Sequence, residues 1–374
     1  MNIGPIQLAQ PFCQAGLAGY SDRAMRLVAR RHGCPYAVTE ALLDTILVNG
    51  GEGLRKSIDI NDEDHPIAGQ IIGSEPATMS AAAKILHERG YDVIDLNFAC
   101  PVKKIKNKAR GGHMLLDIDR ATSIVKAVRD ALPPSAITTV SLRRGFDDSL
   151  ESLERFQRIM ETIWANDFAA VRVHARTVEQ KYLGPSHWDF LREVKKRWPD
   201  KTILGSGDVF TAEDVVRMLS ETGVDIVWIA RGAIGNPWIF QHAAALLAAA
   251  EASRHAAAER SGTPRSAAAG SAINPPTIHE QRDALAEHFA IAMQIHGEQL
   301  AGRRMRKMGI KYSRFHPQST DVKTEFINVK SLRDWQTVLD RFYQTEGPGV
   351  WPAPNAADEV NDGLSLAECA EAKV

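Results

Sequence analysis

Short β-branched runs alternate with longer amphipathic segments up to about residue 250, and this alternation limits the folds open to the chain. Eight runs predict strands: 6–14, 36–40, 66–72, 93–99, 137–142, 169–175, 202–206 and 225–230. Helical periodicity lies between them, at 80–90, 118–132, 149–164, 188–198 and 212–223. Eight strand–helix units of this size match an α/β fold of the (β/α)8 TIM-barrel type. A doubly wound sheet would show the same alternation, but no GxGxxG follows the first strand, so we favour a closed barrel.

Beyond the barrel, the sequence predicts a small all-α domain. Residues 278–345 have helical periodicity, with Leu285, Phe289 and Met293 at every fourth position. The Ala-, Ser- and Gly-rich stretch before them is expected to extend the last barrel helix to about Ala258 and then to act as a linker. We therefore divide the chain into a catalytic barrel domain at 1–250, a flexible linker at 251–277, a helical domain at 278–345 and a disordered acidic tail at 346–374.

The sequence also excludes several classes of protein. It contains no apolar run of about 18 residues that could span a membrane, and its N-terminus lacks the basic and apolar regions of a signal peptide. The four cysteines, Cys13, Cys34, Cys100 and Cys369, have no paired spacing, which argues against a disulfide framework and a zinc knuckle. We expect a cytoplasmic protein without a metal site, a membrane contact or an obligate protein partner.

Positive charge is concentrated in two segments although the net charge is −1. The first follows Cys100, and the second runs through the predicted helical domain without an acidic residue. Their basic residues are Lys103, Lys104, Lys106, Lys108 and Arg110, and then Arg303, Arg304, Arg306, Lys307, Lys311 and Arg314. Local potential attracts a polyanion even where the summed charge does not. The alternative for each segment is an ordinary solvated surface.

Polar residues stand at the predicted C-terminal ends of the strands, where barrel enzymes place their chemistry. They are Gln70, Asn97, Cys100, Arg143, His174, Arg176, Ser206, Asp208 and Arg231. The turns Gly205-Ser206-Gly207-Asp208 and Ala230-Arg231-Gly232 follow the last two strands, where barrels often bind phosphate. Glycines that only make tight turns are the alternative. Likewise, the alternative for His174 is a core histidine, and the alternative for Gln70 is a strand cap.

Cys100 ends a strand and precedes a lysine-rich loop. A thiol has an ordinary pKa of about 8.5, which neighbouring cations lower, so it can donate a proton near neutral pH and be regenerated. The position predicts a proton donor that faces a polyanion. The alternative is a small buried hydrophobic residue, which is the commonest role of an unpaired cysteine.

Together these segments resemble the tRNA-dihydrouridine synthases, a flavin-dependent family, across roughly residues 6–345. The resemblance is carried, in order, by AGLAGYSDR at 15–23, QIIG at 70–73, DLNFACPVKK at 95–104, HART at 174–177 and RGAIGNPW at 231–238. It implies reduction of specific tRNA uridines to 5,6-dihydrouridine, with FMN as cofactor and NADPH as reductant. Reduced FMN would deliver hydride to C6 of the uracil, and Cys100 would protonate C5.

The resemblance also implies roles for individual residues. Those that would bind FMN are Gly16, Leu17, Ala18, Gln70, Asn97, Ser141, His174, Ser206, Gly207, Asp208, Ala230 and Arg231. Those that would contact tRNA are Lys103, Lys104, Lys106, Lys108, Arg110, Arg176, Arg303, Arg304 and Arg306.

The sequence departs from the family pattern at three positions: Gly16 replaces a proline, Ala99 a glycine and Ser141 a lysine of the fifth strand. The third departure matters most, because a cation near the flavin would stabilise the reduced ring. Arg143, Arg176 or another cation would have to compensate. Two other functions stay open: a barrel flavoenzyme that acts on a free small molecule, and an RNA-binding paralogue that has lost redox activity.

Overall fold

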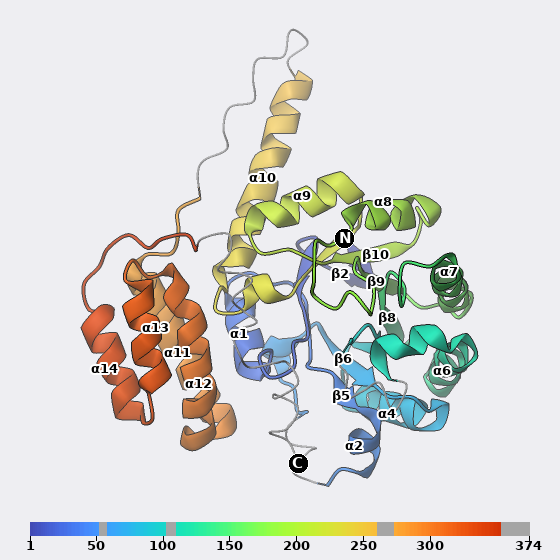
Figure 1. The fold of residues 1–374 in the computed structure, drawn as a ribbon, viewed down its shortest axis with the longest axis horizontal. Coiled ribbons are helices and arrows are strands. Elements are labelled where there is room, and N and C mark those ends of the chain that lie inside the picture. Colours follow the sequence, from blue (N-terminus) through green and yellow to red (C-terminus); the bar gives the residue numbers. More distant parts are fainter. Residues whose placement is uncertain (52–57, 102–109, 260–272, 353–374) are drawn as a thin grey trace.

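Eight parallel strands close into a barrel at the centre of the molecule (Figure 1). The computed structural model describes residues 1–51, 58–101, 110–259 and 273–352. In chain order the barrel strands are β3 (Phe12–Gln14), β4 (Ala37–Val38), β6 (Ile67–Ile72), β7 (Val93–Phe98), β8 (Ile137–Arg143), β9 (Ala170–His174), β10 (Thr202–Ser206) and β11 (Ile226–Ile229). The barrel closes because β11 pairs with β3, and β4 pairs with β6. The short β5 (Leu42–Leu43) adds to the other end of β6. The predicted TIM barrel is confirmed.

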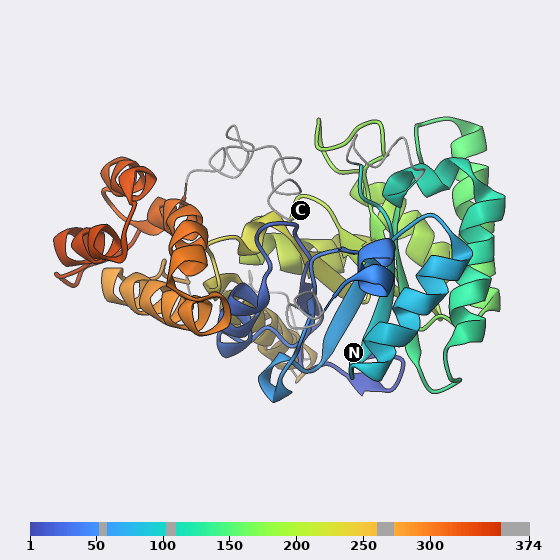
Figure 2. The ribbon, with the colours of Figure 1, turned by 90° about the horizontal axis from the view of Figure 1, so that it is seen from below.

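Helices surround the barrel and cover the outer face of its sheet (Figures 1 and 2). They are α1 (Arg23–Arg31), α2 (Asp44–Asn49), α4 (Pro76–Glu88), α6 (Ile118–Ala131), α7 (Leu150–Ala165), α8 (Trp188–Arg197), α9 (Ala212–Thr222) and α10 (Trp238–Glu259), with the 3-10 turns η1 (Asp62–Asp64), η2 (Gly111–Leu116) and η3 (Arg231–Ala233). The ends of α9 follow directly from the sequence. Thr211 and Asp214 form a capping box at its start, and Gly223 ends it with a φ of +73°.

A hairpin closes the N-terminal end of the barrel. Its strands are β1 (Asn2–Ile3) and β2 (Ile6–Gln7), which pair antiparallel through a turn at Gly4, where φ is +57°. The sequence predicts one strand over 6–14, and this prediction was wrong in its extent. The glycine allows the chain to reverse, so Ile6 and Gln7 pair within the hairpin and the barrel strand begins only at Phe12.

The C-terminal helices form a separate layer beside α1 (Figures 1 and 2). They are α11 (Ile278–His296), α12 (Glu298–Tyr312), η4 (Ser313–Phe315), α13 (Ser319–Asn328) and α14 (Leu332–Phe342). Their core includes Phe289 against Trp335, with ring centroids 4.4 Å apart. In the described part of the chain, no helix has the length and apolar content that crossing a membrane requires.

The boundaries of the predicted linker and tail remain predictions. Helix α10 continues to Glu259, consistent with the expected extension of the last barrel helix. Residues 260–272 of the predicted linker lie outside the described residues, as do residues 353–374 of the predicted tail.

Candidate active site

A continuous chain of hydrogen bonds crosses the C-terminal half of the barrel interior and ends at Cys100. The side chain of Gln70 on β6 donates from Nε2 to Asp95 Oδ2 at 2.8 Å and accepts at Oε1 from Asn97 Nδ2 at 2.7 Å. Asn97 Oδ1 then accepts the backbone N–H groups of Ala99 and Cys100, each at 3.0 Å. Three buried side chains thus determine the path of the backbone where β7 ends.

The Asp95 carboxylate determines which groups donate and which accept in this series of hydrogen bonds. It is 1% exposed and also accepts from Thr139 Oγ1 at 2.6 Å and from Ser141 Oγ at 2.9 Å. An ionised carboxylate only accepts, so Gln70 must present its amide nitrogen to Asp95, and Asn97 must present its oxygen to the backbone. Burial raises the pKa of Asp95, while the donated hydrogen bonds and the charge of Arg172 act in the opposite direction.

Arg172 on β9 supplies a cation beside this network. Its Nε donates to Ser141 Oγ at 2.9 Å, and its guanidinium carbon lies 4.7 Å from the centre of the Trp228 ring. Ser141 and Arg172 are direct neighbours in the β8–β9 register. The position at which the family resemblance leads us to expect a lysine therefore holds a hydroxyl with an arginine bound to it.

Cys100 lies half-buried just beyond β7, and its backbone is fixed on both sides. Its carbonyl oxygen accepts from Gly112 N at 2.9 Å. Gly111 has a φ of +59°, and a Cβ there would lie 2.8 Å from that same oxygen, so the close approach requires glycine. By contrast, Cys13 and Cys34 are fully buried, and burial raises the pKa of both thiols.

Arg143 ties the end of β8 to two neighbouring loops. This fully buried side chain donates from Nε to the Ala99 carbonyl at 2.8 Å, and from Nη1 to the carbonyls of Thr177 at 2.8 Å and Lys181 at 2.7 Å. Burial lowers its pKa to about 10. Three protein carbonyls accept from this arginine, and one of them belongs to Ala99, so Arg143 positions the residue that precedes Cys100.

His174 is held neutral at the end of β9. Burial, followed by the charges of Arg143, Arg172, Arg176 and Arg231, lowers its pKa well below the ordinary value. Its Nδ1 accepts the backbone N–H of Arg176 at 3.2 Å, so the proton of the neutral ring resides on Nε2. The four arginines that surround it make this end of the barrel strongly positive.

A cradle for an anion lies after β10 and β11. Asp208 accepts from Arg176 at 2.7 Å and from Arg231 at 3.1 Å, and its other partner is the backbone N–H of Ser186 at 2.7 Å. Gly207 has a φ of +125°, and a side chain there would overlap Ser186. Two buried donors of this cradle, Arg176 Nη1 and Ser186 Oγ, have no partner among the described residues. Such donors fit a phosphate group.

The first barrel loop brings Gly16, Leu17 and Ala18 to the same end of the barrel. A Cβ on Gly16 would overlap the carbonyl oxygen of Thr39, so this turn requires glycine. The backbone N–H of Leu17 donates to Ser21 Oγ at 2.6 Å, and Ala18 is exposed. Ser206 is buried at the end of β10, and Ala230 follows β11. The predicted flavin contacts thus gather at one end of the barrel, and their roles stay predictions.

The residues predicted to contact tRNA are distributed over several places. The four lysines Lys103, Lys104, Lys106 and Lys108 lie outside the described residues. Arg110 faces the buried carboxylate of Asp44 at 3.7 Å, while Arg176 belongs to the anion cradle. On α12, Arg303 and Arg306 are exposed.

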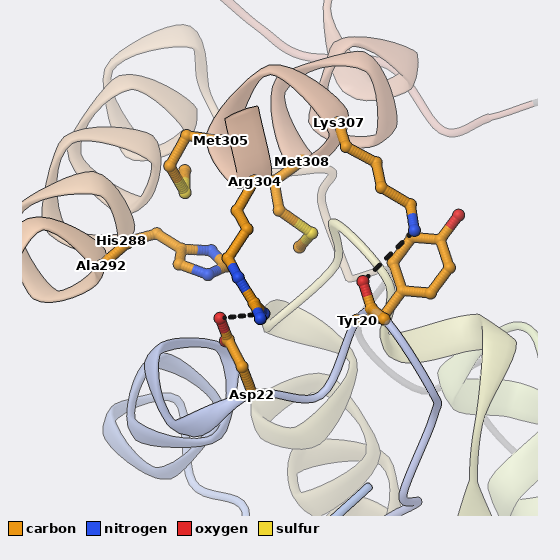
Figure 3. Close-up of a pocket in the computed structure, with 9 residues that line it drawn as sticks. Tyr20, Asp22, His288, Ala292, Arg304, Met305, Lys307 and Met308 are labelled. Atoms are coloured by element: carbon orange, nitrogen blue, oxygen red, sulfur yellow. Dashed lines mark hydrogen bonds and ion pairs between the residues drawn. The ribbon is translucent and has the colours of Figure 1, made fainter. Parts of the chain in front are cut away.

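Arg304 instead joins the helical domain to the barrel (Figure 3). It donates to Asp22 Oδ2 at 2.8 Å, and His296 Nε2 lies 2.8 Å from the same oxygen. Burial would raise the pKa of Asp22, but the hydrogen bond of His296 and the charge of Arg304 outweigh it and hold the pKa well below its ordinary value. Lys307 covers the Tyr20 ring, with Nζ 3.3 Å from its centre. Tyr20, Asp22, Arg304 and Lys307 line a small pocket with His288 and Met308.

Four functional candidates escaped the sequence reasoning: Asp95, Thr139, Arg172 and Trp228. A signal was present, because polar residues recur at every second position on three adjacent strands. They are Asp95 and Asn97 on β7, Thr139, Ser141 and Arg143 on β8, and Arg172 and His174 on β9. Side chains two positions apart share one face of a strand, so this pattern places all of them inside the barrel.

The sequence is similar to those of known proteins along most of its length. The sequence model of the family described as dihydrouridine synthase (Dus) matches residues 13–345. The tRNA-dihydrouridine synthase B of Xanthomonas axonopodis pv. citri (strain 306) is 31% identical over 346 residues, covering 92% of this chain and 95% of that protein. A probable tRNA-dihydrouridine synthase of Mycobacterium tuberculosis (strain ATCC 25618 / H37Rv) is 29% identical over 373 residues, covering 96% and 87%.

A solved structure shows the likeness of the fold. The 6-hydroxypseudooxynicotine amine oxidase of Pseudomonas geniculata N1 superposes with a TM-score of 0.51 at 12% identity, covering 66% of this chain. The matched part makes up 49% of that protein, so this chain spans about half of its length.

Proposed function

The chain belongs to the dihydrouridine synthase family, which makes it an enzyme that reduces uridines in tRNA, and we propose that it works with FMN, NADPH and the Cys100 thiol. The observation that carries the proposal is the hydrogen-bond chain from Asp95 through Gln70 and Asn97 to the Cys100 backbone. It places a thiol and oriented amide groups at one end of the barrel, where the surrounding charge is positive.

The residues present fit a flavin mononucleotide. The donors without partners in the cradle, Arg176 Nη1 and Ser186 Oγ, suit its phosphate, with Arg231 adding charge. An amide side chain both donates and accepts, so Gln70 and Asn97 suit the mixed donor and acceptor edge of the ring. Bound FMN, once reduced by NADPH, supplies a hydride to C6 of the uracil.

The protein's own part in the reaction is alignment and one proton. Cys100 gives its thiol proton to C5 and recovers it from solvent afterwards. His174, which burial keeps neutral, presents Nε2–H as a hydrogen-bond donor without adding charge. Arg143 and Asn97 hold the chain on either side of Ala99, so the thiol stays in place while the substrate enters.

The substrate must be a uracil removed from its stacked position in the RNA, because the reactive groups lie at the barrel end. Exposed Arg303 and Arg306 on α12 would bind the phosphates of the tRNA, and so would the lysines that follow Cys100 in the sequence. Arg304 is engaged with Asp22 and therefore serves to hold α12 against the barrel. The helical domain then sets which uridine reaches the site.

Replacement of the thiol tests this function. We expect Cys100→Ala to keep the yellow flavin and its reduction by NADPH, but to lose dihydrouridine formation by about 100-fold or more, the size of a general-acid contribution. Nucleoside mass spectrometry of a treated tRNA transcript measures the product. Cys34→Ala is the matched control, since it removes a buried thiol away from the site. Native product yield from Cys100→Ala would contradict the proposed proton donor.

A salt titration tests the tRNA surface. We expect Arg303→Gln with Arg306→Gln to weaken tRNA binding and to reduce the slope of log affinity against log salt by about 2, one unit for each lost phosphate contact. The control replaces two exposed basic residues near α14, Lys330 and Arg333, by glutamine. Equal effects of the two double variants would show that α12 has no special part in binding.

A further inference from the structure

The Arg172 side chain uses only part of its hydrogen-bonding capacity. It is 8% exposed and donates from Nε to Ser141 Oγ at 2.9 Å. This is the one hydrogen bond of the Arg172 side chain in the described part of the chain, whereas buried Arg143 satisfies three carbonyl oxygens. A guanidinium has five N–H donors, so the four on its terminal nitrogens are available to a ligand.

Its orientation is nevertheless fixed. The guanidinium carbon lies over the Trp228 ring, 4.7 Å from the ring centre. Ser141 holds Nε from the neighbouring strand. Because the ring contacts the guanidinium and the hydroxyl holds one nitrogen, the terminal nitrogens form a restrained fork on strand β9.

The carboxylate next to Arg172, that of Asp95, makes its hydrogen bonds to other groups. The Ser141 hydroxyl accepts from Arg172 and donates to Asp95, so it bridges the two charges. The Asp95 oxygens in turn accept hydrogen bonds from Thr139, Ser141 and Gln70. The carboxylate therefore offsets the buried cation at a distance and orients the amides, while the fork keeps no direct anionic partner among the described residues.

We propose that Arg172 is the cation that binds the ring of the reduced flavin and stabilises the negative charge that the ring gains on reduction. The proposal rests on the proposed flavin function. A hydride from NADPH carries two electrons and one proton, so its addition to neutral FMN leaves one net negative charge on the ring. Ser141 and Trp228 set the position of the fork, and Asp95 keeps the cation stable inside the barrel before the flavin is reduced.

Binding of flavin in its two redox states tests the proposal. We expect Arg172→Met to weaken the binding of reduced FMN about tenfold more than that of oxidised FMN. By the two-electron relation, a tenfold difference lowers the reduction potential by about 30 mV. Anaerobic titration against reference dyes measures the potential. It should also depend more steeply on pH in the variant near neutrality, because the reduced ring would take up a second proton more readily.

Two further variants distinguish the loss of the Arg172 charge from a general disturbance of the structure. Arg26→Met removes another buried arginine, paired with Asp64, and should leave the potential unchanged. Ser141→Lys combined with Arg172→Thr keeps a buried cation next to Asp95 but moves it to the neighbouring strand. This second variant remains informative if Arg172→Met does not fold. We expect it to restore the preference for reduced FMN to within about threefold.

The outcomes are distinct. A native flavin reduction potential in Arg172→Met overturns the proposal. So does a Ser141→Lys, Arg172→Thr variant that does not restore the preference for reduced FMN. Wild-type protein that binds no flavin overturns the proposed function itself. A lowered potential in Arg172→Met, with Arg26→Met unchanged, supports the assignment.

Discussion

The two ends of the barrel interior are built from the same strands but from opposite chemistry. Towards the N-terminal end the interior is apolar, with Val93, Leu204 and Ile226 packed against the hairpin residue Ile3. Towards the C-terminal end the strands present buried polar groups, several of which donate hydrogen bonds to Asp95. One end therefore serves packing, and the other carries the groups that we propose bind flavin and uracil.

This difference shows where rigidity comes from. Gln70, Asp95, Ser141 and Arg172 all stand on strands, so the sheet hydrogen bonds fix their backbone before any ligand arrives. The anion cradle around Asp208 stands on loops and relies on salt bridges and a positive-φ glycine instead. The strand residues should therefore tolerate least substitution.

Removal of the Asp95 carboxylate should have the largest effect on stability of any change at the polar end. We expect Asp95→Ala to lower the free energy of unfolding by about 3–5 kcal/mol, because Arg172 is left as a buried charge without compensation. Flavin affinity should fall as well, since Gln70 and Asn97 lose the group that orients them. Urea denaturation and flavin titration measure the two effects.

The matched control keeps the carboxylate. Thr139→Val removes one donor to Asp95 and should cost about 1 kcal/mol. If Asp95→Ala were no more damaging than this control, the buried network would not be the feature that distinguishes the polar end.

A cavity at the apolar end should affect stability alone. We expect Leu204→Ala to cost about 3 kcal/mol, the middle of the range for a buried leucine. The rate of dihydrouridine formation per folded molecule should stay native, because the site lies at the other end. A large loss of turnover in the folded fraction would contradict the claim that the apolar end contributes to stability alone.

Acid should affect two histidines: His174, which is half-buried at the polar end, and His288, which is buried in the helical domain. Burial lowers the pKa of His288 to about 4, against about 6.5 when unfolded. Between these values the unfolded chain binds a proton that the folded chain excludes, so stability decreases as the pH falls. We expect this group to contribute a loss of about 1.5 kcal/mol between pH 6.5 and pH 5.

The variant His288→Gln should remove that part of the pH dependence and leave flavin binding native. The lowered pKa of His174 acts in the same direction, so some acid sensitivity should remain. Denaturation curves at several pH values give the slope. An unchanged slope in His288→Gln would contradict a neutral, buried His288.

The strands and the chemical end of the barrel were predictable from the sequence. Seven of the eight predicted strands match observed strands within two residues at either end, because β-branched runs bounded by turns are local signals. The polar residues that follow the strands gave the position of Cys100 and of the Asp208 turn. The hairpin escaped prediction, since the chain reverses at Gly4, where φ is positive, and Ile6 and Gln7 then pair with Asn2 and Ile3 instead of continuing into the barrel strand.

The pairings inside the barrel were harder to predict. The Arg172 to Ser141 hydrogen bond depends on the register of β8 and β9, which spacing along the chain does not specify. The Arg304 to Asp22 contact joins residues 282 positions apart and depends on how the helical domain docks. A run of arginines on α12 therefore looked uniform in sequence although its members have different roles.

A single-turnover experiment tests the central claim that the polar end of the barrel holds a flavin and reduces uridine in tRNA. The purified protein is reduced anaerobically with NADPH and mixed with an unmodified tRNA transcript, while flavin absorbance and dihydrouridine content are followed together. The account predicts one dihydrouridine for each flavin that is reoxidised. Reoxidation by free uracil but not by tRNA, or a protein that carries no flavin, would contradict it.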